Sequence, residues 1–174
     1  MTDTPHWFDH IRDVPDYPKP GIVFKDITPL LGHGPAFRAV IDDFAKVLAP
    51  WQPTQIVGVE SRGFIFGAAI AHAMGLGLTI VRKPGKLPRE TRRVSYALEY
   101  GTDTLEIHAD ALAATDRAVI IDDVLATGGT AAAVGQLVEQ SGATLAGFGF
   151  LLELGFLGGR AKLPAAPVGS LKVL

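Results

Sequence analysis

The sequence has 174 residues and a formal net charge of −2, with 48% hydrophobic and 20% charged residues. A chain of this length and composition is typical of one compact folded domain, and not of a disordered or fibrous protein. The near-zero net charge provides no general positive field for binding nucleic acid. Because the sequence contains no cysteine, disulfides, thiol nucleophiles and cysteine-based metal sites are excluded.

Signals for secretion or membrane insertion are not expected in this sequence. Residues 1–21 carry acids and prolines but no apolar core, so we expect no secretory signal. Elsewhere Gly, Arg or Asp interrupts the apolar stretches well before the roughly 20 residues that cross a bilayer. We therefore expect a cytoplasmic protein with no membrane span and no nucleic-acid partner.

The first third of the chain predicts two helices separated by an extended segment. A short helix is expected around Pro5 to Arg12, and an extended, rigid connector over Val14 to Lys25, where three prolines forbid a regular helix. From Pro35 to Leu48 apolar residues recur at spacings of three and four, which predicts an amphipathic helix.

Two alternations of strand and helix follow. Their predicted elements are strands at Gln55–Val59, Leu78–Val81, Ala118–Ile121 and Thr144–Leu152, and helices at Gly63–Met74 and Gly129–Gln140. Parallel strands joined by helices are covered on both faces, and their binding crevice lies at the carboxyl ends of the strands. We expect an α/β fold with a central, mainly parallel sheet flanked by helices, and functional residues just after the strands.

The region between the two alternations predicts a loop and a hairpin. Lys83 to Thr91 is polar and contains two prolines, which is typical of an exposed loop. Val94–Tyr100 and Thr104–His108 then predict paired strands around a turn at residues 101–103. The pair Gly147 and Gly149 lies inside an apolar strand and indicates a packing or bulge feature.

The segment Val119 to Thr130, VIIDDVLATGGT, carries the strongest chemical signal. Its apolar residues are followed by Asp122 and Asp123, so two carboxylates are predicted where a buried strand ends. The small residues and adjacent glycines that follow allow backbone N–H groups and a helix N-terminus to converge on an anion. Thr127 and Thr130 add hydroxyl groups.

A ribose 5-phosphate fits both halves of this segment. The helix N-terminus favours a phosphate, whereas the carboxylates can accept hydrogen bonds from sugar hydroxyls and attract hydrated Mg²⁺. The alternative is that the acids merely end a strand and the glycines only shape a turn. Kinase and dehydrogenase motifs are disfavoured, because no G-x-x-x-x-G-K-[ST] occurs and Gly75-Leu76-Gly77 lacks a third glycine.

As one contiguous stretch, Val119–Thr130 resembles the phosphoribosyl pyrophosphate signature of type I phosphoribosyltransferases. Five further blocks resemble those of the family members that act on adenine, in the same order: PKPGIVFKDITPLL, VGVESRGFIFG, RKPGKLP, SYALEYG and LEIH. The resemblance implies the type I phosphoribosyltransferase fold as a single domain over residues 1–174. Residues 1–34 would form an N-terminal hood and base-binding segment, and residues 83–103 a lid loop with a β-hairpin turn.

The resemblance also implies a role for each matched position. Residues that would bind the phosphoribose are Asp122, Asp123, Ala126, Thr127, Gly128, Gly129 and Thr130. Residues that would bind pyrophosphate are Glu60, Ser61, Arg62, Arg82, Lys83 and Lys86, with a non-proline cis peptide at Glu60–Ser61. Residues that would contact the base are Val23, Phe24, Arg62 and Leu154. Glu99 would handle a proton on the purine ring as the catalytic group.

Plainer readings stay open for several of these residues. Arg62 could form a surface ion pair, the cations after the strand at Leu78–Val81 could be solvated, and Glu99 could be a solvated strand residue. Val23 and Leu154 could serve core packing alone. These alternatives predict no contact with a substrate.

The reaction implied by the resemblance is transfer of the phosphoribosyl group from phosphoribosyl pyrophosphate to adenine, giving AMP and pyrophosphate. Mg²⁺ would be held mainly by the substrate, with no direct protein ligand, and the enzyme would be a homodimer. One alternative is the same transfer to hypoxanthine, guanine, xanthine or orotate. Another is a sensor of phosphoribosyl pyrophosphate without catalysis, although no basic helix for DNA binding is evident.

Overall fold

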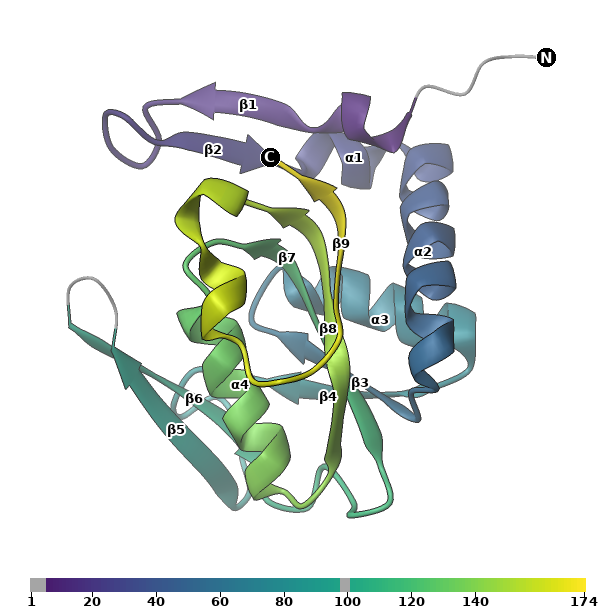
Figure 1. The fold of residues 1–174 in the computed structure, drawn as a ribbon, viewed down its shortest axis with the longest axis vertical. Helices are drawn as coiled ribbons and strands as arrows, with labels where there is room; N and C mark the ends of the chain where they lie inside the picture. The colour runs from purple at the N-terminus through teal and green to yellow at the C-terminus, as the bar shows by residue number, and fades with distance from the viewer. Residues whose placement is uncertain (1–5, 98–100) are drawn as a thin grey trace. The chain divides into compact units, whose positions relative to one another are not determined.

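The computed structural model describes residues 6–97 and 101–174 (Figure 1). Packing divides the chain into two compact units, of which the first ends at Asp43 and the second runs from Phe44 to Leu174. Helix α2 (Gly34–Leu48), which closely matches the predicted amphipathic helix, continues from the first unit into the second.

The first unit contains a 3-10 helix, η1 (Trp7–His10), a two-stranded hairpin and the short helix α1 (Thr28–Gly32). The prediction of a helix at Pro5–Arg12 holds only as this single 3-10 turn. The predicted connector is extended at both ends, as expected, but its ends pair with each other as β1 (Arg12–Pro15) antiparallel to β2 (Val23–Asp26), so the segment is a hairpin.

A cross-strand ion pair supports the first-unit hairpin, and its prolines lie where they do not disturb the pairing. The Lys25 ammonium lies 2.6 Å from the Asp13 carboxylate, and these two residues are directly opposite in the register. Pro15 ends β1, and Pro18 and Pro20 lie in the connection, so no proline interrupts the middle of a strand.

The second unit is built on a five-stranded sheet in the order β4-β3-β7-β8-β9, and every neighbouring pair in it is parallel. The strands are β3 (Gln55–Val59), β4 (Gly77–Val81), β7 (Arg117–Leu125), β8 (Thr144–Glu153) and β9 (Val168–Val173). The predicted α/β fold with a parallel sheet is confirmed. Strand β9 has no counterpart among the predicted elements.

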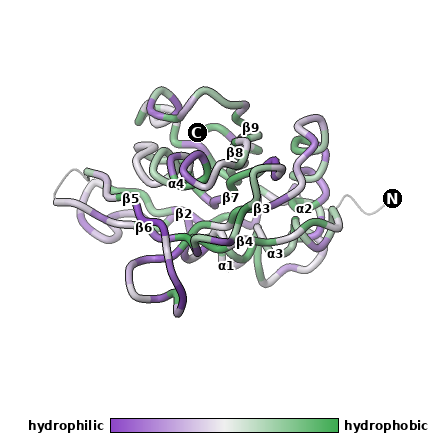
Figure 2. The backbone as a smooth tube through the Cα atoms, turned by 90° about the horizontal axis from the view of Figure 1, so that it is seen from below, coloured by the Kyte–Doolittle hydropathy of each residue, from purple (hydrophilic) through white to green (hydrophobic). Residues whose placement is uncertain are grey.

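Helices α3 (Gly63–Met74) and α4 (Gly129–Gln140) begin and end at the predicted residues and lie on opposite sides of the sheet (Figure 2). Strand alternation sends side chains to both faces. On one face, Val57 and Ile120 join a buried cluster with Val134 of α4. On the other face, a Cβ at Gly67 of α3 would lie 3.3 Å from the Cα of Gly58, so α3 packs closely on β3.

The predicted hairpin is confirmed, with β5 (Thr91–Ala97) antiparallel to β6 (Thr102–His108). Its predicted turn at residues 101–103 is wrong, because Thr102 and Asp103 already pair with Ala97 and Tyr96. Residues 98–100 of the predicted first strand lie outside the described residues. Arg82 and Glu106 exchange backbone hydrogen bonds of 2.9 and 2.7 Å, which connects the end of β4 to β6. The inner face of the hairpin is buried in the cluster under α4.

The glycines of β8 are packing features, as predicted. A Cβ at Gly147 would lie 2.5 Å from the Trp51 ring, and the register of β7 and β8 shifts between Ala118 and Val119. Trp51 belongs to the 3-10 helix η2 (Ala49–Trp51). The guanidinium of Arg117, at the amino end of β7, donates to the Trp51 carbonyl at 2.8 Å and the Gln52 carbonyl at 3.1 Å.

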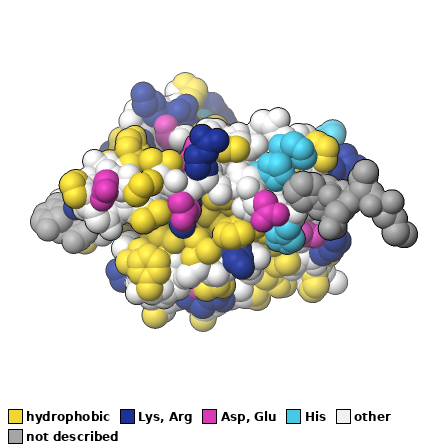
Figure 3. Space-filling view, turned by 90° about the horizontal axis from the view of Figure 1, so that it is seen from above, with side chains coloured by type: hydrophobic (Ala, Val, Ile, Leu, Met, Phe, Trp, Pro, Cys, Tyr) yellow, Lys and Arg dark blue, Asp and Glu magenta, His cyan; other side chains and the backbone are white. Residues whose placement is uncertain are grey.

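The surface has a mixed character that agrees with the small net charge. On the face drawn in Figure 3, basic and acidic side chains are scattered among hydrophobic and uncharged ones. Within residues 6–97 and 101–174, no helix is both long and apolar enough for a bilayer span.

Candidate active site at the carboxyl end of β7

Strand β7 carries the acidic pair inside the sheet. The prediction that the strand ends at Ile121 is wrong, because β7 continues through both acids to Leu125. The physical reason is its neighbour: β8 remains paired with β7 as far as Leu125 and Glu153. Asp122 and Asp123 are consecutive strand residues, so their side chains leave opposite faces of the strand.

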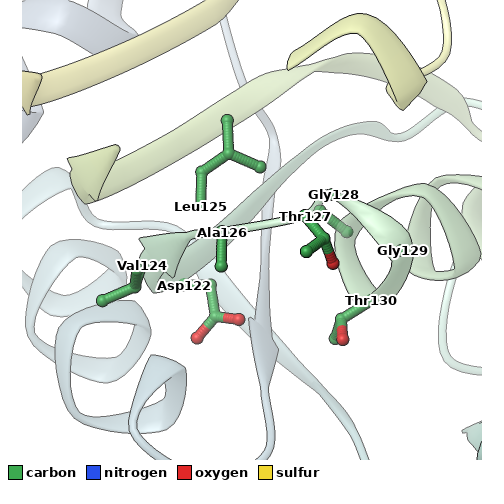
Figure 4. A pocket seen from close by; sticks show the side chains of 9 residues that line it. Asp122, Val124, Leu125, Ala126, Thr127, Gly128, Gly129 and Thr130 are labelled. Carbon is green, nitrogen blue, oxygen red and sulfur yellow. The ribbon is translucent and has the colours of Figure 1, made fainter. Parts of the chain in front are cut away.

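An open hollow lies between the end of β7 and the start of α4. Its empty space is about 330 Å³, and it is lined by Asp122, Val124, Leu125, Ala126, Thr127, Gly128, Gly129, Thr130 and Ala131. Figure 4 shows the Asp122 carboxylate and the hydroxyl-bearing side chains of Thr127 and Thr130 around this hollow. The structure thus brings together all of the predicted phosphoribose residues except Asp123.

Glycine is required where the loop enters α4. Gly128, the residue before the helix, has a φ of +82°, a left-handed conformation that favours glycine. In addition, a Cβ at Gly128 would lie 2.2 Å from the carbonyl oxygen of Gly159. The loop therefore passes directly over the backbone of a second segment, the 3-10 turn η4 (Gly159–Lys162).

Burial gives the acidic pair unusual protonation behaviour. Burial raises the pKa of Asp122 well above its usual value, and the nearby charge of Asp123 raises it further. Burial also raises the pKa of Asp123, although the positive charge of Arg62 opposes this change. The Arg62 Nε lies 2.9 Å from Asp123 Oδ2, which is the closest ion-pair contact of the buried acid.

The turn between β3 and α3 lies beside the acidic pair. A Cβ at Gly63 would lie 2.7 Å from the Ile121 carbonyl oxygen and 3.0 Å from Asp122 Oδ1, so the two segments are in close contact. The peptide bond between Glu60 and Ser61 is cis, which confirms that prediction. Ser61 is exposed, and Arg62 is turned toward Asp123.

Two of the predicted pyrophosphate residues after β4, Arg82 and Lys83, are already paired with acids. The Arg82 guanidinium donates to both Glu60 carboxylate oxygens at 3.2 and 3.3 Å, and the Lys83 backbone N–H donates to Glu60 at 2.8 Å. Burial opposes ionisation of Glu60, but these hydrogen bonds hold its pKa below the usual value. Lys86 is exposed.

The hairpin touches the loop through a network that the sequence motifs did not single out. The Tyr96 hydroxyl lies 3.0 Å from Thr130 Oγ1 and 3.5 Å from Asp103 Oδ2, and the Lys83 ammonium lies 2.8 Å from the same Asp103 oxygen. Tyr96 lies two residues after the buried Val94 in β5 and therefore on the same face, so strand periodicity was the available signal.

None of the predicted catalytic and base-binding residues that the structure describes lines the hollow. Glu99 lies outside the described residues. Leu154 is partly buried, and its N–H donates to the Leu125 carbonyl at 2.9 Å. Val23 and Phe24 lie on β2 of the first unit, where Phe24 contacts the Tyr17 ring at 5.2 Å between centroids. Their roles toward a base stay predictions.

The described residues offer no preformed metal centre. Within that part of the chain, no group of three or more histidines and acids is placed to hold a metal ion by itself. Asp122 and Asp123 nevertheless supply carboxylate oxygens of the kind that Mg²⁺ prefers, and Asp122 lines the hollow.

Comparisons with known proteins agree with this geometry. The sequence matches the family model of the phosphoribosyl transferase domain over residues 30–157. The adenine phosphoribosyltransferase of Anaeromyxobacter sp. (strain Fw109-5) is 59% identical over 153 residues, covering 88% of this chain and 86% of that protein.

Solved structures give the same result. The crystal structure of adenine phosphoribosyltransferase from Thermoanaerobacter pseudethanolicus has a TM-score of 0.93 and 50% identity, covering 96% of this chain and 97% of that one. The adenine phosphoribosyltransferase of Saccharomyces cerevisiae, in complex with an imino-altritol bisphosphate and adenine, has a TM-score of 0.91 and 43% identity, with coverages of 95% and 96%.

Proposed function

Because this chain belongs to the phosphoribosyl transferase family, and within it to the adenine phosphoribosyltransferases, we propose that the segment from Asp122 to Thr130 binds the phosphoribosyl group. The enzyme transfers that group from phosphoribosyl pyrophosphate to adenine, giving AMP and pyrophosphate, a reaction of purine salvage. The observation that carries the site assignment is the hollow in which Asp122 faces a glycine-rich helix N-terminus.

The 5-phosphate binds at the start of α4 in this proposal. Backbone N–H groups of Ala126 to Gly129 converge where no bulky side chain obstructs them, and the positive end of the helix dipole favours the anion. The hydroxyls of Thr127 and Thr130 line the same hollow and donate to phosphate oxygens. A phosphate held here places the sugar toward Asp122.

The two acids have different roles in this proposal. Asp122 accepts hydrogen bonds from them in its ionised form, whereas Asp123 is held by Arg62 and keeps that cation next to the site. When Mg²⁺ is bound with the substrate, it offsets negative charge on the pyrophosphate. The carboxylates fit this ion as acceptors of its water ligands, so we also propose a requirement for Mg²⁺.

The cations around the β3–α3 turn stabilise the leaving pyrophosphate. Arg62, Arg82, Lys83 and Lys86 provide positive charge, Ser61 provides a hydroxyl, and Glu60 holds Arg82 and the Lys83 backbone in place. Charge placed in advance where it develops in the transition state lowers the barrier. The reaction inverts the configuration at the anomeric carbon. Close placement of the base next to this carbon makes the other large contribution to the rate.

The base is held by Val23, Phe24, Arg62 and Leu154 in this proposal, and Glu99 handles the proton on the purine ring. A branched side chain and an aromatic ring suit a flat heterocycle. A carboxylate is chemically adequate for the proton transfer. These assignments rest on the family blocks in the sequence.

We further propose a homodimer located in the cytoplasm, as the family resemblance and the composition suggest. Sedimentation of the purified protein tests the first statement, and fractionation of cells tests the second. A monomer at working concentration would overturn the dimer proposal.

One experiment tests the proposed site directly. Thr130→Ala removes a hydroxyl from the hollow, so the KM for phosphoribosyl pyrophosphate should rise about tenfold while the KM for adenine changes little. Product analysis with adenine, hypoxanthine, guanine, xanthine and orotate in parallel should give AMP fastest. An unchanged KM in the variant would contradict the phosphate assignment.

A further inference from the structure

The phosphate loop lies on a turn that contributes no lining residue to the hollow. A Cβ at Gly159 would lie 2.1 Å from the Ala126 carbonyl oxygen and 2.9 Å from the Gly128 backbone nitrogen. Both partners are backbone atoms, so neither can give way by rotating a side chain. The position of the η4 turn therefore determines where the loop backbone can lie.

The residue after Gly159 anchors this turn to the sheet. The Arg160 guanidinium bonds both oxygens of the Glu153 carboxylate, with Nε at 3.0 Å and Nη2 at 2.5 Å. Its Nη1 donates to the Val168 carbonyl at 3.1 Å, and the Ser170 hydroxyl donates to Glu153 at 2.6 Å. Arg160 thus connects the turn to the end of β8 and to β9.

The ion pair between Arg160 and Glu153 restrains the position of the η4 turn. Glu153 is 7% exposed, and Arg160 holds the pKa of its carboxyl below the usual value against the effect of burial. Two parallel bonds from a planar guanidinium restrain both distance and orientation, which an ammonium cannot do. A partly buried pair with a hydroxyl donor is also less screened than a surface ion pair.

We propose that Arg160 is a positioning residue for the substrate's phosphoribosyl group, acting through Gly159 on the loop at Ala126–Gly128. The inference rests on the proposed role of that loop. The Arg160 side chain bonds Glu153, Val168 and Ser170, none of which lines the hollow, and it holds the turn that the loop backbone contacts. The loop has helix α4 on one side, and the anchored turn supplies its second support.

The test compares Arg160 with Arg117, because each guanidinium donates to backbone carbonyl groups. Arg117 lies at the amino end of β7, whereas Arg160 bonds Glu153 at the carboxyl end of β8. Arg160→Gln should raise the KM for phosphoribosyl pyrophosphate about tenfold and change kcat less than about threefold, because ground-state binding is what the loop provides. Arg117→Gln removes a guanidinium that donates to two carbonyls at the amino end of β7. It should lower the melting temperature without changing this KM.

Two further variants separate the possible causes. Gly159→Ala leaves the Glu153–Arg160 pair in place but forces the turn away from Ala126, so the same rise in KM is expected. Arg160→Lys keeps the positive charge but loses the two parallel bonds, so the KM for phosphoribosyl pyrophosphate should rise by an intermediate amount. This variant replaces Arg160→Gln in the test if the glutamine variant does not fold. Calorimetric titration with phosphoribosyl pyrophosphate alone should show the same weakening.

The outcomes are distinct. If Arg160→Gln and Arg117→Gln lower the melting temperature alike and neither changes the KM, Arg160 is only a stabilising residue and the inference is wrong. If Thr130→Ala raises the KM but Gly159→Ala does not, the loop assignment stands and the coupling through Gly159 is wrong. If Thr130→Ala also has no effect, the proposed loop function itself fails.

Discussion

Two strand-to-helix connections meet at the carboxyl end of the sheet, and they are built in different ways. The connection from β7 to α4 consists of small and hydroxyl-bearing residues, and its backbone is held by close contact with Gly159. The connection from β3 to α3 is charged, and its Glu60 and Arg62 are each paired with a residue from another segment. The first connection can bind an anion without breaking an internal contact, whereas the charged side chains of the second must give up ion pairs within the protein before they can bind a ligand.

The difference shows where preorganisation comes from in this site. Backbone N–H groups at a helix start need no counterion, so they can be left open to the substrate. Cationic side chains, by contrast, form ion pairs with acids of the protein itself when no substrate is bound. The Lys83 ammonium, for example, lies 2.8 Å from the Asp103 carboxylate. Substitutions in the β7–α4 connection should therefore weaken binding, whereas removal of an acid that holds one of the neighbouring cations should strengthen it.

The largest effect is expected from Gly128→Ala. The new Cβ would lie 2.2 Å from the Gly159 carbonyl, and the φ of +82° is unfavourable for alanine. Misplaced N–H groups should lower kcat/KM by about 1,000-fold. Gly142→Ala is the matched control, since its φ is +83° and its nearest described contact is 3.9 Å away. It should cost about 1 kcal/mol of stability and leave the kinetics unchanged.

A smaller loss of activity, joined to a gain in stability, is expected from Asp122→Asn. The variant should lose about 100-fold in kcat/KM because an amide accepts sugar hydroxyls less well than a carboxylate. A carboxyl whose pKa is raised by folding stabilises the folded state fully below its unfolded pKa, and this contribution disappears as pH rises through the folded pKa. The variant should therefore melt higher than the parent near pH 8.

The pH dependence supplies the control for this prediction. At a pH below the ordinary value of an aspartate, both proteins carry a neutral group at position 122, so the advantage of the variant should shrink on acidification. Asp110→Asn removes an exposed acid whose pKa is lowered by Arg89, and it should not melt higher. A variant that melts lower than the parent at pH 8 would contradict the burial argument.

A moderate effect is expected from Tyr96→Phe, which cuts the contact between the hairpin and the loop. Loss of the hydroxyl 3.0 Å from Thr130 removes one neutral hydrogen bond, so the KM for phosphoribosyl pyrophosphate should rise about fivefold. Ser95→Ala removes the neighbouring hydroxyl, which bonds Thr104 at 2.8 Å, and should not change this KM. Equal KM values for the two variants would show that the hairpin does not align Thr130.

The smallest effect, with the opposite sign, is expected from Asp103→Asn. The neutral side chain would release the Lys83 ammonium for the substrate, so the KM for phosphoribosyl pyrophosphate should fall about threefold. The amide oxygen can still accept the Thr104 N–H, which is bonded at 2.9 Å in the parent. A steady-state measurement at low ionic strength gives the clearest result, and a rise in KM would contradict the idea that Asp103 withholds the Lys83 ammonium from the substrate.

The sequence predicted the central βαβ units well because their signals are local. Gly63 begins α3 and Gly75 follows it, and small residues precede α4, so the first and last residues of both helices were predicted correctly. The acids of β7 were placed just outside the strand because their own side chains are polar, whereas the pairing that extends the strand comes from β8. Long-range pairing decides such a boundary, and a local pattern cannot report it.

The same limit explains the missed elements and partners. Strand β1 has only four residues, and both β1 and β9 lie beside stretches that contain prolines, so no clear alternation marks them. Glu153 and Arg160 are seven residues apart in the chain. The local sequence indicates only a strand end at the first and a polar turn at the second. Only the folded chain shows that they bond each other. The hollow, by contrast, is formed by one contiguous segment, and sequence alone identified it.

The close contact between Gly128 and Gly159 has a consequence for how such proteins can diversify. Each of these positions excludes a Cβ because of the other's backbone, although 31 positions separate them in the chain. A single replacement at either site meets the same obstacle, and no compensating side-chain change at the partner can relieve it. Variation in substrate affinity within a lineage should therefore accumulate in the charged connection and the hairpin, while the two glycines stay unaltered.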